Sequence, residues 1–169
     1  MSRVFWEVIF VNRELLSVVY ELGADILSSD GMKSEKNFIH HGDFSCFDHS
    51  LRVAAASVYI AVKFGISVDM RSLVRGALLH DYFLYDWHEN DPSHRLHGFH
   101  HAKRALMNAE HDFCLNNIEK EIIIRHMFPL NITPPRYAES RIVCLADKLC
   151  AAGEVAVNYK NRMIKILTA

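Results

Sequence analysis

Apolar side chains recur at intervals of three and four residues along most of the chain, which is the spacing of one face of an α-helix. The first such run predicts one helix or two abutting helices over residues 3–28, with inward positions Val4, Val8, Val11, Leu15, Val18 and Leu22. Residues 31–44 are polar and predict a loop that begins at Gly31. No stretch of the sequence alternates apolar and polar residues in the manner of a strand. The pattern therefore favours an all-α fold.

Local start and stop signals divide the rest of the chain into helices. Residues 45–48 read Ser-Cys-Phe-Asp, the form of a capping box, and predict a helix that runs to about Phe64. Gly65 is the expected stop, and Asp69 is the expected cap of a third helix. Further helices are predicted over residues 98–110, 118–127, 137–152 and, beyond Gly153, 154–166. We therefore expect a single all-α domain over 1–169, a bundle of about six to eight helices with a core at 41–152 and the helices 3–28 and 154–166 packed on it.

Composition narrows the class of protein and adds one anomaly. The 169 residues fit one domain, and a formal net charge of −1 gives no reason to expect binding to nucleic acid or to an anionic membrane. Glu7 interrupts the apolar run near the N-terminus, and nothing approaches the roughly 20 apolar residues of a membrane span. The 4 cysteines include no C-x-x-C pair, so we expect reduced thiols and a cytoplasmic location. The anomaly is the 11 histidines.

Several of these histidines fall on the apolar faces of different predicted helices, together with two aspartates. The inward set is His49, His80, Asp81, His101, His126 and Asp147. Each residue taken alone also fits a hydrogen-bonded side chain of the core. Together, four imidazoles and two carboxylates would make a costly polar interior unless something binds them. The sequence therefore predicts a metal centre, with the dipeptide His80-Asp81 at its middle.

The order of these residues resembles the signature of a known family. His49, then His80-Asp81, then Asp147 is similar to the H…HD…D pattern of the HD-domain superfamily of metal-dependent phosphohydrolases. The resemblance runs from about His41 to Ala152 and includes the residues that flank each part of the signature. The chain is most similar to the small, stand-alone bacterial HD proteins. This resemblance implies an HD-type helical bundle with metal at its centre.

In the dinuclear members of that superfamily, two further histidines lie between the HD pair and the last aspartate. His101 and His126 occupy those places. The resemblance implies that Asp81 bridges two metals, one held with His49, His80 and Asp147 and the other with His101 and His126. Mixed nitrogen and oxygen ligation suits iron, manganese, zinc, cobalt or nickel. One or two divalent ions of this kind are therefore the expected cofactors, and a mononuclear site is the alternative.

Two details bear on the ligand assignment. His97, His100 and His101 compete for one position; His97 and His101 share a helix face, and His101 fits the family pattern better. His97 is the second choice and otherwise a candidate substrate contact. Met127 follows His126, so the paired histidines of the cyclic-dinucleotide phosphodiesterases are absent. Cyclic-di-GMP is therefore not the predicted substrate.

Cationic side chains near the predicted ligands are candidates for holding a phosphate. Arg52 lies one helical turn after His49, and Lys148 directly follows Asp147. We predict catalytic parts for both cations, with Arg52 also binding substrate. Arg104 is a further candidate for substrate binding, although a surface charge explains it slightly better. For each of these cations the alternative interpretation is a solvated surface side chain.

The main functional hypothesis is a metal-dependent phosphohydrolase that acts on a phosphate ester or a nucleotide-like phosphate. Metal binding lowers the pKa of water toward neutrality, and Asp81 is the predicted catalytic residue that orients this water or takes its proton. His41 and Asp86 lie in predicted loops and are expected at the mouth of the site, with His41 as a substrate contact. The expected partner is a small phosphorylated molecule, and both a monomer and a homodimer are compatible with the sequence.

Two other functions are compatible with parts of the pattern. Diiron oxygenases of the same superfamily, of the inositol-oxygenase type, use the same four histidines and two aspartates, so the ligands alone do not separate them from the hydrolases. The third hypothesis is a non-catalytic module that binds a nucleotide. Degenerate HD domains of that kind lose ligand residues, and none of the predicted set is lost here.

Overall fold

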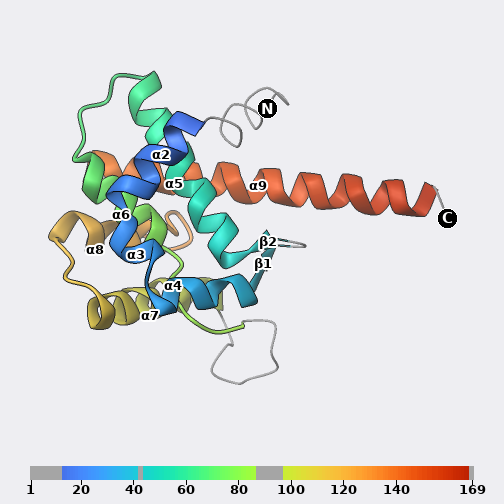
Figure 1. The fold of residues 1–169 in the computed structure, drawn as a ribbon, viewed down its shortest axis with the longest axis horizontal. Coiled ribbons are helices and arrows are strands. Elements are labelled where there is room, and N and C mark those ends of the chain that lie inside the picture. The colour runs from blue at the N-terminus through green and yellow to red at the C-terminus, as the bar shows by residue number, and fades with distance from the viewer. Residues whose placement is uncertain (1–12, 42–43, 87–96, 168–169) are drawn as a thin grey trace.

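The computed structural model describes residues 13–41, 44–86 and 97–167, which form a bundle of helices with one small hairpin (Figure 1). In chain order the elements are α2 (Arg13–Leu22), α3 (Ala24–Leu27), α4 (Asp30–Ser34), the 3-10 helix η1 (Glu35–Asn37), β1 (Ile39–His41), β2 (Phe44–Ser45), α5 (Cys46–Lys63), α6 (Met70–Leu79), α7 (His97–Asp112), α8 (Asn117–Arg125) and α9 (Ala138–Leu167). The all-α class predicted from the apolar spacing is confirmed.

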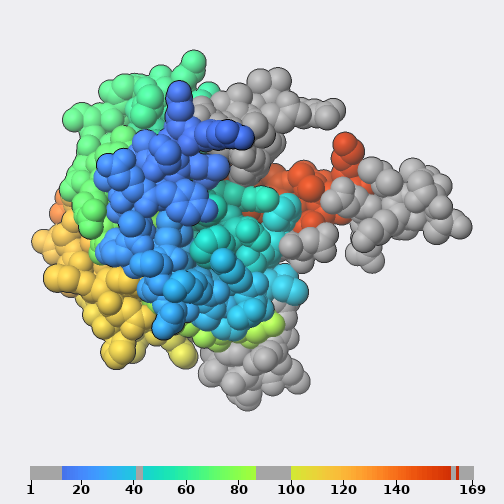
Figure 2. All heavy atoms as spheres, in the orientation of Figure 1, coloured from blue at the N-terminus to red at the C-terminus, as the bar shows by residue number. Residues whose placement is uncertain are grey.

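The helices pack around α5 and α6, which contact each other and the long helix α9. Three consecutive alanines of α5, residues 54–56, are buried and let the neighbouring helices approach closely. Gly76 has the same effect where α6 meets α8, because a methyl group there would overlap the Ile122 side chain. Figure 2 shows the N-terminal segment, in blue, covering one face of this bundle. The result is a core in which five helices, α5 to α9, meet around one interior region.

The predicted start and stop signals of α5 and α6 are present. The Ser45 side chain accepts a hydrogen bond from the Asp48 amide, and the Asp48 side chain accepts one from the Ser45 amide. Asp69 caps α6 by accepting a hydrogen bond from the Ser72 amide. Just beyond α5, Gly65 has a φ of 62°, a backbone conformation that favours glycine. These local signals fix where α5 begins and how α6 is placed.

The prediction of a loop over residues 31–44 is wrong for most of that stretch, which contains α4, η1 and the two strands. In the antiparallel hairpin Ile39 pairs with Ser45 and His41 pairs with Phe44, so two steps along β1 match one step along β2. His40 is therefore the additional residue of a β-bulge. The strands are too short to show any alternation, which is why the sequence pattern missed them.

The predicted break at Gly153 is also wrong, because α9 continues through it and includes the expected separate helix over 154–166. One glycine inside a helix costs about 1 kcal/mol, which the packing of so long a helix outweighs. Figure 1 shows α9 running past α5 and extending beyond the other described helices. Of the predicted N-terminal helix over 3–28, residues 3–12 lie outside the described part of the chain. None of the described helices is both long and apolar enough to cross a membrane.

Candidate metal centre

The structure brings the six predicted ligand residues together in the interior of the bundle. They come from five helices or helix ends: His49 from the first turn of α5, His80 and Asp81 from the end of α6, His101 from α7, His126 from the end of α8 and Asp147 from α9. The side chains are buried, with residue exposures of 0 to 8 %. Segments that are far apart in the sequence thus converge on one polar cluster.

Backbone carbonyl groups orient two of the imidazole rings. The Nδ1 of His80 lies 2.8 Å from the carbonyl oxygen of Ala77, and the Nδ1 of His126 lies 2.7 Å from that of Ile123. Because a carbonyl only accepts, the neutral ring carries its proton on Nδ1 and presents the lone pair of Nε2 to the interior. The Nε2 of His80 has no hydrogen-bond partner among the described residues. Histidines that bind metals usually donate their other ring N–H in this way, which fixes the tautomer.

One group of ligand atoms lies between α5, α6 and α9. The Nε2 of His49 is 3.2 Å from Oδ1 of Asp147, and the Nε2 of His80 is 3.8 Å from the same oxygen. One donor atom from each residue lies within 4.8 Å of the other two. These three side chains could therefore hold a single ion.

A second group lies between the end of α6, α7 and α8. The Nε2 atoms of His101 and His126 are 2.9 Å apart, and they lie 3.3 and 3.4 Å from Oδ1 of Asp81. Because His126 presents a lone pair there, the two nitrogens share either a proton or a cation. This group is also close enough to hold one ion.

Asp81 connects the two groups through its two carboxylate oxygens. Its Oδ1 faces His101 and His126, whereas its Oδ2 lies 3.5 Å from the Nε2 of His80. A carboxylate divided in this way can neutralise charge on both sides at once. Each of its oxygens therefore faces a different group of imidazoles.

The electrostatics of the centre keep its carboxylates charged. Burial raises the pKa of Asp81 and of Asp147, but the surrounding imidazoles outweigh it and hold both pKa values well below the ordinary range. Burial lowers the pKa of His126, which favours its neutral form. The centre therefore offers anionic oxygens and at least one neutral imidazole in a buried position, a combination that favours a bound cation.

Glu154 completes the environment of His49, and sequence reasoning missed it. Its Oε2 lies 3.0 Å from the Nδ1 of His49, and its Oε1 lies 3.5 Å from the guanidinium of Arg52. Burial raises the pKa of Glu154, but hydrogen bonds with His40 and His49 outweigh it and lower the pKa to about 2. Glu154 follows Asp147 by two helical turns on α9, so helical spacing was a usable signal.

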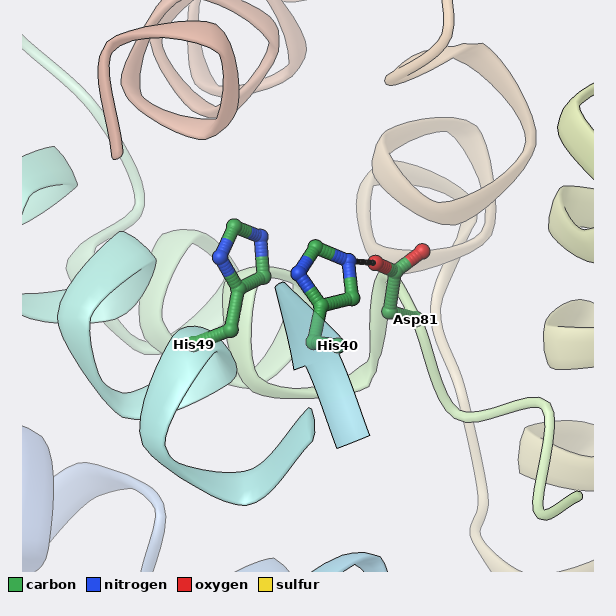
Figure 3. Close-up of side chains that lie close together, drawn as sticks. All are labelled: His40, His49 and Asp81. Carbon is green, nitrogen blue, oxygen red and sulfur yellow. Dashed lines mark hydrogen bonds and ion pairs between the residues drawn. The ribbon is translucent and has the colours of Figure 1, made fainter. Parts of the chain in front are cut away.

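His40 is the second residue that the sequence did not single out. Its Nε2 lies 3.0 Å from Oδ2 of Asp81, and its ring stacks on the ring of His49 with centroids 3.9 Å apart (Figure 3). The sequence prediction named the neighbouring His41 instead, since both histidines stand in a stretch predicted to be a loop. The bulge in β1 falls at His40.

The segment that follows Asp81 is held in place by α7. The amide nitrogen of the Asn108 side chain donates to the carbonyl oxygens of Tyr82 and Phe83, at 3.1 and 3.0 Å. Tyr82 is fully buried, and its hydroxyl donates to Asp112 at 2.8 Å. These bonds fix the backbone directly after the His80-Asp81 dipeptide.

The predicted substrate contacts occupy different surroundings. The Arg52 guanidinium stacks over the Phe44 ring at 3.9 Å, and the exposed Arg104 lies 5.5 Å from the centroid of the Tyr85 ring. The Lys148 ammonium donates to the carbonyl oxygen of His126 at 2.9 Å, which ties α9 to the end of α8. The side chains of His41 and His97 lie outside the described residues. Substrate contact by these five residues remains a prediction.

The residues present fit a transition metal. Imidazole nitrogens with fixed tautomers and ionised carboxylates converge from several elements, which is the donor chemistry of iron, manganese, zinc, cobalt and nickel sites. Among the described residues, the buried groups that converge here are imidazoles and carboxylates, with no lysine or arginine among them, so a metal would add positive charge to the cluster. Calcium and magnesium prefer oxygen ligands and fit less well.

Comparison with known proteins identifies the region around this centre. The family model described as HD domain matches residues 46–152, which is more than half of the chain and includes all six predicted ligands. No curated protein and no solved structure matches the chain significantly.

Proposed function

Because the chain belongs to the HD-domain family, we propose that it is a metal-dependent phosphohydrolase with a dinuclear centre. The observation that carries this proposal is the division of the Asp81 carboxylate between two groups of imidazoles. A mononuclear site would leave one of those groups as a cluster of buried lone pairs without a counter-charge, which is costly. We assign the activity to a single HD domain over 1–169.

Two sets of side chains would hold the ions. His49, His80, Asp147 and Oδ2 of Asp81 would hold one, and His101, His126 and Oδ1 of Asp81 would hold the other. Bound divalent transition metals supply Lewis acidity toward a phosphoryl oxygen and a hydroxide nucleophile near neutral pH.

The protein side chains then have separate tasks. Asp81 is the catalytic residue that orients the attacking water or accepts its proton, because its oxygens lie where both groups meet. Arg52 binds a phosphate oxygen, since its guanidinium is one turn from His49 and remains 24 % exposed. Lys148 acts in catalysis by positioning His126, because its ammonium group donates a hydrogen bond to the carbonyl oxygen of His126 at the end of α8. Arg104, His41 and His97 are the proposed outer contacts of the substrate.

The substrate class follows from this arrangement and from the family. We propose a small phosphate ester or nucleotide-like phosphate, hydrolysed in the cytoplasm without nucleic-acid or membrane partners. Each imidazole and carboxylate of the centre is then used in positioning a phosphoryl group or its nucleophile. Both a monomer and a homodimer accommodate this function.

The direct test is an assay of purified, metal-verified protein against a model phosphomonoester and a model phosphodiester, with oxygen uptake followed in parallel. We expect phosphate or alcohol release without oxygen consumption. Asp147→Ala should abolish the release, whereas the exposed His111→Ala should not change it. Substrate-dependent oxygen uptake by the iron form would instead indicate the oxygenase branch of the family. Substrate binding without turnover by any metal form would indicate a non-catalytic module.

A further inference from the structure

The bulge in β1 falls at His40, between the paired residues Ile39 and His41. In a regular antiparallel strand, successive side chains point to opposite faces, so His40 would point away from the face of Ile39 and His41. The additional residue breaks this alternation, and bulges commonly re-aim a side chain next to an active site. In Figure 3 the His40 ring lies between His49 and Asp81.

The contacts of His40 join it to both sides of the centre. Its Nε2 lies 3.0 Å from Oδ2 of Asp81, and its Nδ1 lies 3.8 Å from Oε2 of Glu154. The ring stacks on that of His49, with an angle of 22° between the two ring planes. One donor atom each from His40, His49 and Asp81 lies within 4.8 Å of the other two.

A hydrogen-bonding role alone leaves this arrangement poorly explained. Asp81 already faces three other imidazoles, so its charge does not need a further hydrogen-bond donor. The His40 side chain is only 11 % exposed, and ordering it on a bulged two-stranded hairpin has an entropic cost. A shared cation would offset this entropic cost, because it would bind the lone pair of His40 and the carboxylate of Asp81 together.

We propose that His40 is a further metal ligand, which binds the ion held by His49 and Oδ2 of Asp81. This inference rests on the proposed metal centre and adds an imidazole from the hairpin to the ligands from the helices. The first ion would then have donors from β1, α5, α6 and α9. The hairpin would be ordered by the metal, and the family signature would describe only part of the coordination.

The test is a Co²⁺ titration of protein labelled with ¹⁵N-histidine, followed by the hyperfine-shifted imidazole N–H signals and by competition with a chelator. We expect the His40→Ala variant to lose one shifted imidazole and to bind one Co²⁺ about tenfold or more weakly. His40→Gln keeps a hydrogen-bonding group near Asp81, and we expect it to bind Co²⁺ as weakly as the alanine variant. His111→Ala removes an imidazole that is 87 % exposed and should leave both readouts unchanged.

Two results would overturn the proposal. The first is a His40→Ala variant with the full set of shifted imidazoles and parental Co²⁺ affinity. The second is recovery of that affinity in His40→Gln, which would assign His40 to hydrogen bonding with Asp81. Should the alanine variant not fold, the glutamine variant and the number of shifted signals in the parent decide the question. A His80→Ala variant that binds Co²⁺ like the parent would instead refute the centre itself, and the role of His40 with it.

Discussion

Two buried polar clusters lie in the same helical bundle, and they are satisfied in different ways. In one, Arg75 of α6 donates to Glu119 of α8 at 2.6 Å and also pairs with Asp25 of α3. The second oxygen of Glu119 accepts the amide of Asn116 at 2.9 Å, as part of a capping box. Each of the three guanidinium nitrogens of Arg75 faces an acceptor within the protein.

The cluster around Asp81 has the opposite character. The Nε2 atoms of His101 and His126 face each other at 2.9 Å, and the Nε2 of His80 has no hydrogen-bond partner among the described residues. His126 and Asp81 both present acceptors to the Nε2 of His101, so this group is satisfied either by a proton on that nitrogen or by a cation. Both clusters are buried and charged, so what separates them is whether their donors and acceptors are matched within the protein.

The largest expected effect follows from breaking the shared ligand. Asp81→Ala should lose most of both bound ions and lower the hydrolytic rate by about a thousandfold or more, because one carboxylate serves both groups. Elemental analysis and the phosphatase assay measure the two effects. Asp30→Ala, at an exposed carboxylate paired with Lys33, is the matched control. Parental metal content in the Asp81 variant would contradict the assignment of the bridge.

Breaking the other cluster should change stability and leave metal binding intact. Arg75→Met leaves the buried carboxylate of Glu119 without its cationic partner and should lower the free energy of unfolding by about 3–5 kcal/mol. Urea denaturation measures this loss, and metal content of the folded variant should equal that of the parent. Arg71→Met, whose side chain is 59 % exposed, should change stability by no more than about 0.5 kcal/mol. Loss of metal in the Arg75 variant under folding conditions would show that the two clusters are not independent.

A smaller effect is expected at the carboxylate that orients His49. Glu154→Gln keeps an acceptor for Nδ1 but removes the charge, and should weaken binding of the first ion by about 10- to 100-fold. Chelator competition gives the affinity of each ion separately. Glu110→Gln, at an exposed carboxylate paired with Lys120, should leave both affinities unchanged. Equal weakening of both ions by Glu154→Gln would argue against its specific link to His49.

Glu35 provides the smallest test, because it is a buried carboxyl group that belongs to neither cluster. Its two oxygens have no hydrogen-bond partner among the described residues, and burial, with the charge of Asp81, raises its pKa well above 4.5. Above pH 4.5 the unfolded chain therefore loses this proton while the folded chain keeps it. Stability should fall as the pH rises from 4.5 toward the raised folded value, by at most about 1.4 kcal/mol per pH unit.

The matched variant for this test is Glu35→Gln in metal-free protein. It should remove that part of the pH dependence and be more stable than the parent above the unfolded pKa, because the amide stays neutral in both states. Urea unfolding at a series of pH values measures the difference between the two proteins. A difference that does not change with pH would contradict the raised pKa of Glu35.

Sequence reasoning reached the parts of this molecule that depend on local periodicity. Helical spacing placed His49, His80 and Asp147 on inward faces, and the capping signals located the start of α5. The continuity of α9 through Gly153 was not predictable from local rules, because the packing that outweighs a glycine is tertiary. His40 was missed for a related reason: a bulge is defined by the pairing of two strands, and nothing in one short strand reveals it.

Electron paramagnetic resonance of the Mn²⁺-loaded protein can detect whether Asp81 bridges two metal ions. With metal content measured on the same sample, we expect two ions per chain and the exchange-coupled spectrum of a carboxylate-bridged pair, which Asp81→Ala should abolish. One ion per chain with the hyperfine sextet of isolated Mn²⁺ would contradict the bridge.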